Sequence, residues 1–154
     1  ISKKYTDEVV LPNLELGATK AGRTLNKFEI SGGGFIVSGS TNDELSVNLE
    51  KVRKRIAFYA STRSYEPVMA LHGWQTTAQN LYRMSVDGRW NDMAAEITDE
   101  MLETFAVIGT YDTIVDKIIE RFGSFSTTIN FSIPILTSSD EVLLKQMLKR
   151  LQSS

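Results

Sequence analysis

The chain has 154 residues, of which 42% are hydrophobic and 23% charged, a composition typical of one soluble globular unit with a single core. Seventeen Lys and Arg residues against 19 Asp and Glu leave a formal net charge of -2, which argues against nucleic acid or an anionic membrane as a partner. The lack of cysteine excludes disulfides, thiolate metal sites and cysteine nucleophiles, and fits a reducing cytosol. No apolar run approaches the roughly 20 residues that span a bilayer, and no signal-peptide pattern opens the chain, so we expect a cytoplasmic protein.

The first part of the chain predicts a helix, a strand and a second helix. Residues 5–21 carry an apolar stripe that predicts a surface helix ended by Gly22. Residues 28–39 place aromatic and β-branched residues on both sides of a glycine cluster, which predicts one buried strand. Residues 41–44 form a capping-box pattern. It opens a helix whose apolar residues recur at intervals of four and three, namely Leu45, Leu49, Val52, Ile56 and Tyr59.

The middle of the chain predicts helices only. Shorter helical pieces are expected between residues 65 and 105, and Thr98 is expected to begin one of them. Thr110 is expected to cap a further helix with a broad apolar face, which Gly123 ends. The run 105–110 is thus interpreted as the approach to that helix.

The last two predicted elements are a strand over residues 126–133 and a terminal helix opened by a capping-box pattern at residues 138–141. The order helix, strand, several helices, strand, helix predicts an α/β fold with parallel strands joined by helical crossovers. Two strands do not make a stable sheet, and a (β/α)8 barrel takes roughly 250 residues, so we expect further strands outside this chain. A start at Ile1, without methionine and directly in a helix-like run, fits that expectation.

Four segments of the chain, taken in order, resemble the C-terminal region of luciferase-like monooxygenases, particularly a deazaflavin-dependent subgroup. They are residues 52–65, 71–74, 88–93 and 104–109. The resemblance covers nearly the whole chain. It implies the C-terminal portion of a (β/α)8 TIM barrel, in which residues 28–38 are strand seven and residues 126–133 are strand eight. Residues 1–154 would then be the C-terminal part of one barrel domain, with a helical insertion at about 41–104.

The resemblance also implies a function. The parent protein would be an oxidoreductase or monooxygenase that transfers a hydride to or from a small-molecule substrate, or activates oxygen, through reduced coenzyme F420 or FMN. In that family most coenzyme contacts come from the first six strands, so the isolated chain is expected to be inactive. The alternative is a non-catalytic half-barrel, a structural or interaction module that pairs with itself or with an N-terminal partner.

Barrel active sites lie at the C-terminal ends of the strands, which selects the candidate coenzyme-binding residues. Ser38 and Gly39 follow the predicted seventh strand, and Phe105 and Gly109 lie on the run expected to return to the same face. Core packing explains the apolar run equally simply. The glycine cluster at residues 32–34 lacks the Lys-Ser/Thr of a phosphate loop, so close packing within the barrel is favoured over phosphate binding.

Four side chains in the predicted insertion are candidate substrate-binding residues. His72 is the single histidine, and the neighbouring Trp74 can stack on a flat ligand; the alternative is a helix-terminal histidine beside a buried tryptophan. Arg63 can clamp an anionic group with Tyr65 donating a hydrogen bond, or it can extend the solvated basic face of residues 51–55.

No catalytic residue is singled out by the sequence. It has no nucleophile elbow and no Ser-His-Asp order. One histidine and scattered carboxylates offer no metal-ligand spacing, so no metal site is expected. Asp99 and Glu100 at a predicted helix start complement the helix dipole and need no catalytic role.

Overall fold

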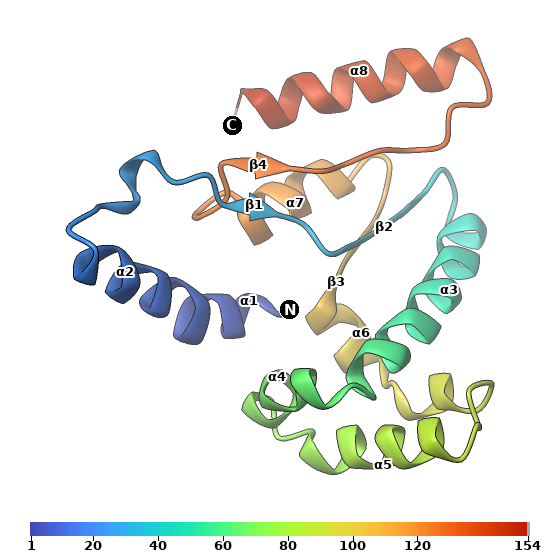
Figure 1. Ribbon diagram of the computed structural model, residues 1–154. Coiled ribbons are helices and arrows are strands. Elements are labelled where there is room, and N and C mark those ends of the chain that lie inside the picture. Colours follow the sequence, from blue (N-terminus) through green and yellow to red (C-terminus); the bar gives the residue numbers. More distant parts are fainter. Residues whose placement is uncertain (154) are drawn as a thin grey trace.

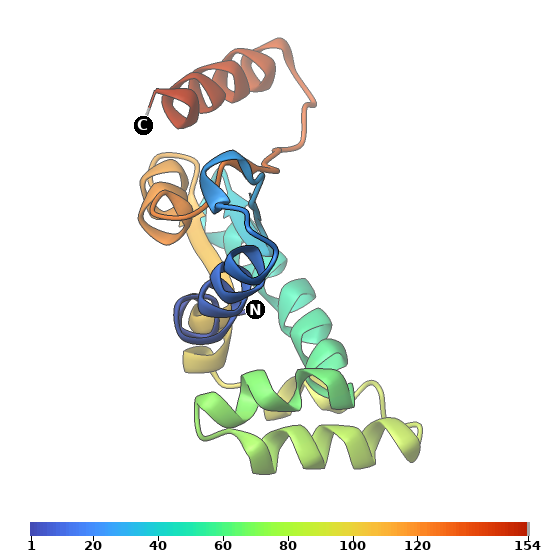
Figure 2. The same ribbon diagram turned by 60° about the vertical axis from the view of Figure 1, so that its left-hand side comes forward.

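A computed structural model describes residues 1–153, apart from the side chain of Lys27. Figures 1 and 2 place a helical arm beside the strands, the helix pair α4 and α5 at the bottom of the molecule, and α8 at its top. The N-terminal half contains α1 (Lys3–Tyr5), a π-helical turn (Thr6–Val10), α2 (Leu11–Lys20), a 3-10 turn (Leu25–Lys27), β1 (Ser31–Gly32), β2 (Phe35–Gly39), α3 (Asn42–Ala60), a 3-10 turn (Arg63–Tyr65) and α4 (Glu66–Leu71). The remaining elements are α5 (Gln75–Val86), a 3-10 turn (Met93–Glu96), α6 (Asp99–Phe105), β3 (Ala106–Thr110), α7 (Ile114–Phe122), β4 (Thr128–Ile129) and α8 (Ser138–Gln152).

The prediction of one strand over residues 28–39 is wrong. The chain forms two short strands, β1 and β2, separated by Gly33 and Gly34 at φ angles of 153° and 126°, which favour glycine. β1 pairs in parallel with β4, whereas β2 pairs in parallel with β3. The glycines therefore mark the point where the chain leaves one sheet and joins another.

The prediction that residues 105–110 approach a helix capped by Thr110 is also wrong, because residues 106–110 form the strand β3. Each residue of β2 has a partner in β3, from Phe35 opposite Ala106 to Gly39 opposite Thr110. Since the strands are parallel, helices α3 to α6 carry the chain from the carboxyl end of β2 to the amino end of β3. They form a crossover and do not return to the end from which they left.

The close-packing interpretation of the glycine cluster holds at Gly32. A Cβ atom there would lie 2.1 Å from the Ser126 hydroxyl oxygen and 3.3 Å from the ring of Phe122. The predicted strand at residues 126–133 is real but shorter, since only Thr128 and Ile129 pair with β1.

Helix starts were predicted more accurately than strands. The hydroxyl oxygen of Thr41 accepts a hydrogen bond from the Glu44 N–H, and that of Thr98 accepts one from the Met101 N–H. The expected second capping box exists, but it begins one residue earlier, at Thr137. The Asp140 carboxylate accepts from the Thr137 N–H at 2.8 Å and the Thr137 hydroxyl oxygen accepts from the Asp140 N–H, which completes the box.

The apolar side chains form two clusters instead of the single core expected. The first joins helices α3 to α6 and contains Ile56, Ala57, Ala60, Met69, Ala78, Leu81, Met84, Met93, Ile97, Met101 and Leu102. The second joins β3, α7 and α8 and contains Val107, Ile114, Val115, Ile118, Phe122, Phe131, Ile133 and Met147. The helices between β2 and β3 thus have a hydrophobic core of their own.

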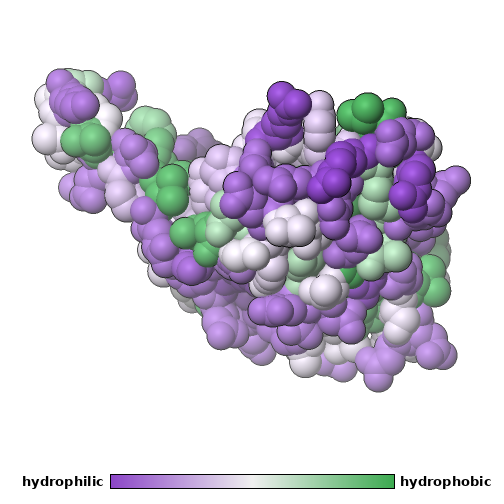
Figure 3. Space-filling model, turned by 90° about the horizontal axis from the view of Figure 1, so that it is seen from below, coloured by the Kyte–Doolittle hydropathy of each residue, from purple (hydrophilic) through white to green (hydrophobic). Residues whose placement is uncertain are grey.

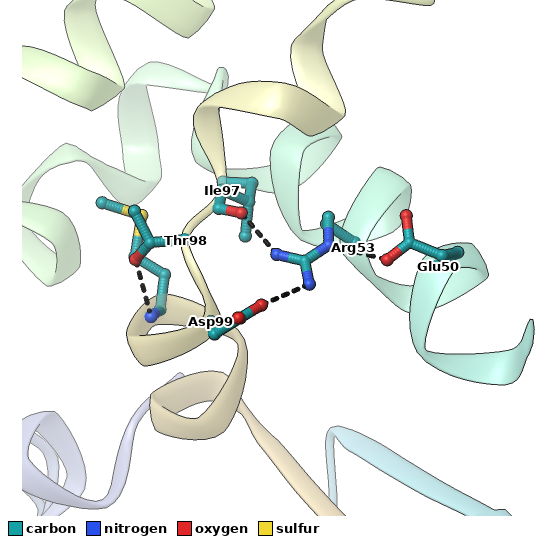
Figure 4. Close-up of polar contacts among 6 residues, drawn as sticks. Glu50, Arg53, Ile97, Thr98 and Asp99 are labelled. Carbon is teal, nitrogen blue, oxygen red and sulfur yellow. Dashed lines mark hydrogen bonds and ion pairs between the residues drawn. The ribbon is translucent and has the colours of Figure 1, made fainter. Parts of the chain in front are cut away.

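Arg53 links α3 to the start of α6 (Figure 4). Its guanidinium donates to the Ile97 carbonyl oxygen at 2.5 Å, to Asp99 at 2.6 Å and to Glu50 at 3.0 Å. The Arg53 side chain is only 16% exposed, whereas Asp99 is 84% exposed. The carbonyl bond and the packing of the arginine stem therefore outweigh the ion pair in stabilising this junction.

We expect Arg53→Ala to lower the free energy of unfolding by about 1–3 kcal/mol, because the Ile97 carbonyl loses its buried donor. Asp99→Ala should change it by less than about 1 kcal/mol, because exposed ion pairs contribute little. Urea unfolding of both variants followed by tryptophan fluorescence measures the difference. Equal losses in the two variants would contradict this division between the carbonyl bond and the ion pair.

Candidate functional site

A cavity of about 270 Å³ lies at the amino end of β2. Gly34 and Phe35 border it where β2 begins, and Phe105, the last residue of α6, borders it as well. The helices α3 and α4 supply most of the remaining wall, together with Tyr65 from the turn between them and Ile1. The lining residues are Ile1, Gly34, Phe35, Arg55, Ile56, Tyr59, Ala60, Tyr65, Val68, Met69 and Phe105.

Aromatic rings dominate one wall of this cavity. The ring of Tyr59 lies 5.9 Å from that of Phe35 and 5.5 Å from that of Tyr65, in tilted and edge-on arrangements that favour aromatic contact. The Arg55 guanidinium lies 5.1 Å from the Phe35 ring centroid. The cavity therefore combines apolar aromatic walls with one cationic side chain, a composition suited to a flat ligand that carries negative charge.

Three of the four candidate coenzyme-binding residues lie together, and Phe105 lies apart from them. Ser38 and Gly109 are paired across β2 and β3 near the carboxyl ends of the strands, and Gly39 is next to them. Phe105 precedes the amino end of β3 and lies in the cavity. The parallel pairing of β2 with β3 therefore brings Gly109 beside Ser38 and Gly39, as expected, but it places Phe105 at the opposite end of the two strands.

Helix packing accounts for the two glycines among these candidates. A Cβ at Gly39 would lie 2.6 Å from the backbone nitrogen of Leu45, and one at Gly109 would lie 2.7 Å from the Thr113 hydroxyl oxygen. Each glycine therefore lets a following helix start close to its strand. The Ser38 carbonyl oxygen accepts a hydrogen bond from the Asn48 side chain at 3.0 Å, which ties β2 to α3.

His72 and Trp74 are brought together, as the sequence proposed, but mainly by packing. Their rings stack with centroids 4.8 Å apart, and Phe105 meets both rings edge-on at 5.9 Å and 5.8 Å. His72 Nε2 shares a hydrogen bond of 2.7 Å with the hydroxyl of the buried Ser2. Through Phe105 this stack supports the wall of the cavity, although neither His72 nor Trp74 lines it.

The environment of His72 predicts a pH dependence of stability. Burial, and then the positive charge of Lys4, lower the pKa of the imidazole, while Glu100 and Glu8 oppose this. The folded chain therefore binds the proton less readily than the unfolded chain, whose pKa is about 6.5. The stability that the neutral His72 contributes is fully present above that pH, and it is lost as the pH falls below it.

We expect the free energy of unfolding to decrease between about pH 7 and about pH 5.5, and His72→Asn to lack this contribution. Urea unfolding of both chains across that range measures the difference between their free energies of unfolding. In this difference the contributions of the other titrating groups cancel. A parallel decline in the two chains would show that His72 is not responsible.

Arg63 and Tyr65 face different surroundings. Tyr65 lines the cavity. Arg63 instead donates a hydrogen bond to the Tyr82 hydroxyl oxygen at 2.9 Å and stacks on the Tyr82 ring at 4.5 Å from its centroid. It borders a second hollow, between α3, α4 and α5. The proposed pairing of Arg63 and Tyr65 on one ligand is therefore not supported by the geometry.

Sequence reasoning missed Phe35, Tyr59 and Met69 as cavity residues, because periodicity assigns them to a strand or a helix core. The signal for Phe35 was present in the adjacent glycines, which break the strand at this point. Among residues 1–153 no group of His, Asp and Glu side chains has the arrangement of a metal site. Within the same residues no helix is long and apolar enough to cross a membrane.

Comparison with known proteins finds a matching family model and several relatives of similar sequence. A sequence model described as luciferase-like monooxygenase matches residues 2–128. An uncharacterized protein of Mycobacterium tuberculosis is 40% identical over 121 residues, which cover 79% of this chain and 36% of the relative. The 5,10-methylenetetrahydromethanopterin reductase of Archaeoglobus fulgidus is 27% identical over 133 residues, which cover 83% of this chain and 39% of that reductase.

A solved structure shares the α/β fold. The coenzyme F420 dependent tetrahydromethanopterin reductase from Methanopyrus kandleri superposes with a TM-score of 0.65 and 26% identity, over 88% of this chain and 38% of that one. The chain thus spans little more than a third of the length of the curated relatives it matches. The family match covers most of the chain, as the four sequence segments had indicated, and the chain belongs to the luciferase-like monooxygenase family.

Proposed function

We propose that this chain contributes part of the active site of a barrel oxidoreductase, and that its aromatic cavity receives part of a planar coenzyme or of the substrate beside it. The observation that carries the proposal is the cavity itself, which is lined by the aromatic side chains of Phe35, Tyr65 and Phe105 beside the cationic Arg55.

We further propose that residues 28–38 and 126–133, which each contain only short strands here, occupy the positions of strands seven and eight of a (β/α)8 barrel, and that residues 41–104 are the insertion. The parallel pairing of β1 with β4 supports this, because neighbouring barrel strands are parallel. The separate core of α3 to α6 supports the insertion, because helices with their own core can be added to a barrel without disturbing it.

The residues present fit the ring of coenzyme F420 or a flavin, but not a whole coenzyme. Pockets for drug-sized ligands span roughly 300–1,000 Å³, and the cavity of about 270 Å³ lies just below that range. The relatives named as reductases include one described as coenzyme F420 dependent, which favours coenzyme F420 over FMN. When bound, such a coenzyme supplies the hydride chemistry.

The side chains of this chain would bind and orient the planar ring, and they would keep water away from it. Phe35, Tyr65 and Phe105 offer aromatic faces or edges against a flat ring, which also keep water from it. Arg55 would attract negative charge on the ring or the substrate. His72 and Trp74 would act indirectly, by holding Phe105 in place.

The proposal is tested by titrating the chain into coenzyme F420, and separately into FMN, and measuring fluorescence anisotropy. We expect saturable binding of one coenzyme, weakened about tenfold or more in Phe105→Ala, since an aromatic stacking contact contributes roughly 0.5–1.5 kcal/mol beyond the area it buries. Phe28→Ala is the matched control, because Phe28 is exposed and lies outside the cavity. No binding of either coenzyme, or equal weakening in both variants, would count against the proposal for this chain.

The second candidate function is a non-catalytic module that pairs with itself or with an N-terminal partner. Both sheets have only two strands among residues 1–153, so each strand has an edge without a strand partner. Apolar side chains near α8 are also exposed, with Leu136 at 88% and Ile135 at 54%. Sedimentation equilibrium is expected to show self-association, and a monodisperse monomer would contradict this second function.

A further inference from the structure

A second hollow of about 360 Å³ is lined by the end of α3, the turn that follows it, the start of α4, and α5. Ala60 borders both, so the two spaces are neighbours. The second hollow is polar where the first is aromatic. Its charged and hydroxyl-bearing lining residues are Ser61, Thr62, Arg63, Glu66, Tyr82 and Arg83. Figure 3 shows that the face over α4 and α5 is largely hydrophilic.

The Arg63 side chain is fixed in this hollow by its contacts with Tyr82. The Tyr82 ring supports the guanidinium from one side at 4.5 Å, and the Tyr82 hydroxyl accepts from one of its nitrogens at 2.9 Å. The remaining N–H groups of the guanidinium have no carboxylate within 4.0 Å among residues 1–153. A stacked guanidinium has lost side-chain freedom in advance, so less entropy is lost when it binds an anion.

Arg83 adds a second positive charge without a carboxylate partner among the same residues. Its guanidinium donates to the neutral amide oxygen of Asn80 at 3.1 Å. The single acidic lining residue, Glu66, accepts a hydrogen bond from Gln75 at 3.2 Å. The charged side chains around the hollow therefore leave a positive balance in a chain whose net charge is -2.

The end of α3 also borders the hollow, and helix carboxyl ends repel anions. That repulsion is reduced here, because three carbonyl groups of the last turn already have hydrogen-bond donors. The Ser61 N–H donates to the Ala57 carbonyl, and the Thr62 N–H donates to the Tyr59 carbonyl. The Ser61 hydroxyl donates to the Phe58 carbonyl, so the Thr62 hydroxyl is the one left to face an anion.

From this arrangement we infer that Arg63, Arg83 and Tyr82 form an oxyanion-binding site, for a phosphate or carboxylate group that places two oxygens against the Arg63 guanidinium. Two oxygens match the parallel N–H groups of a guanidinium edge. The inference stands apart from the proposed coenzyme function, since it needs no ligand in the aromatic cavity. If both hold, the oxyanion belongs to a ligand that extends past Ala60.

The test uses inorganic phosphate and, separately, glutarate, each titrated into ¹⁵N-labelled chain in a buffer without other oxyanions. We expect saturable shifts of the Arg63 side-chain and Thr62 backbone signals. Phosphate should bind more tightly if the site is built for a phosphate group, and glutarate if it is built for a carboxylate. The two titrations thereby distinguish the two sources of the oxyanion.

Three variants separate guanidinium recognition from general charge. Arg63→Ala and Arg63→Lys should both weaken binding, by about tenfold for the alanine, because lysine keeps the charge but loses the paired N–H groups. Arg89→Ala is the matched control, since Arg89 is exposed, paired with Asp92 and outside the hollow. The dispersion of the amide spectrum shows that each variant is folded. Absent saturation with both anions, full binding in Arg63→Lys, or equal weakening in Arg89→Ala would overturn the inference.

Discussion

Replacing Leu81 by alanine should lower the free energy of unfolding by about 2–5 kcal/mol, the range for large-to-small changes in a packed core. Leu81 lies on α5 with 0% of its surface exposed. It belongs to the cluster that joins α3 to α6. Because the core is closely packed, the removed side chain would leave a cavity that the neighbouring side chains fill only in part. Urea unfolding followed by tryptophan fluorescence measures the loss, since Trp74 packs against the same cluster.

Val86→Ala is the matched control, because Val86 lies on the same helix with 69% of its surface exposed. Its effect should stay within about 0.5 kcal/mol. Similar losses in the two variants would mean that helix α5 is not packed as described. A transition in Leu81→Ala that splits in two would show that the two apolar clusters unfold separately.

The second large effect is expected for Gly39→Ala, which should destabilise the chain by about 1–3 kcal/mol or prevent folding. The added Cβ would lie 2.6 Å from the Leu45 backbone nitrogen and 3.0 Å from its Cα. Because these are backbone atoms at the start of α3, the helix and β2 would have to move apart. Thermal unfolding by circular dichroism measures the change.

Gly17→Ala serves as the control, since Gly17 lies in helix α2 and a Cβ there meets no atom within 4 Å. It should stabilise the chain by up to about 1 kcal/mol, because alanine favours the helix. The comparison also decides the role of Gly39, which the sequence assigned to a coenzyme. Unchanged stability in Gly39→Ala together with lost coenzyme binding would favour the coenzyme role over helix packing.

Local signals in the sequence predicted the helices well. Thr41 and Thr98 begin helices as expected, because a hydroxyl that caps a helix acts within three residues. Gly22 follows the first helical segment with a φ of 65°, again a local property. The family resemblance was equally accessible, because its segments lie in order along the chain.

The strands were predicted less well, because short apolar runs do not reveal their partners. Residues 106–110 have the buried pattern of a parallel strand, yet they lie between two predicted helices, and their sequence is interpreted as the approach to the second of these. The error moved Phe105 to the wrong end of the sheet. The split of β1 from β2 at Gly33 and Gly34 was likewise hidden, because only pairing with β4 and β3 distinguishes the two strands.

The sequence by itself determined the family, the α/β class and most helix starts, since these depend on composition and on neighbours within a few residues. Only the tertiary structure decided which side chains meet. It joined Tyr65 and Phe105 across 40 residues in one cavity, and it turned Arg63 away from Tyr65 toward Tyr82. Such contacts depend on strand pairing and helix packing between distant segments, which no local pattern in the chain specifies.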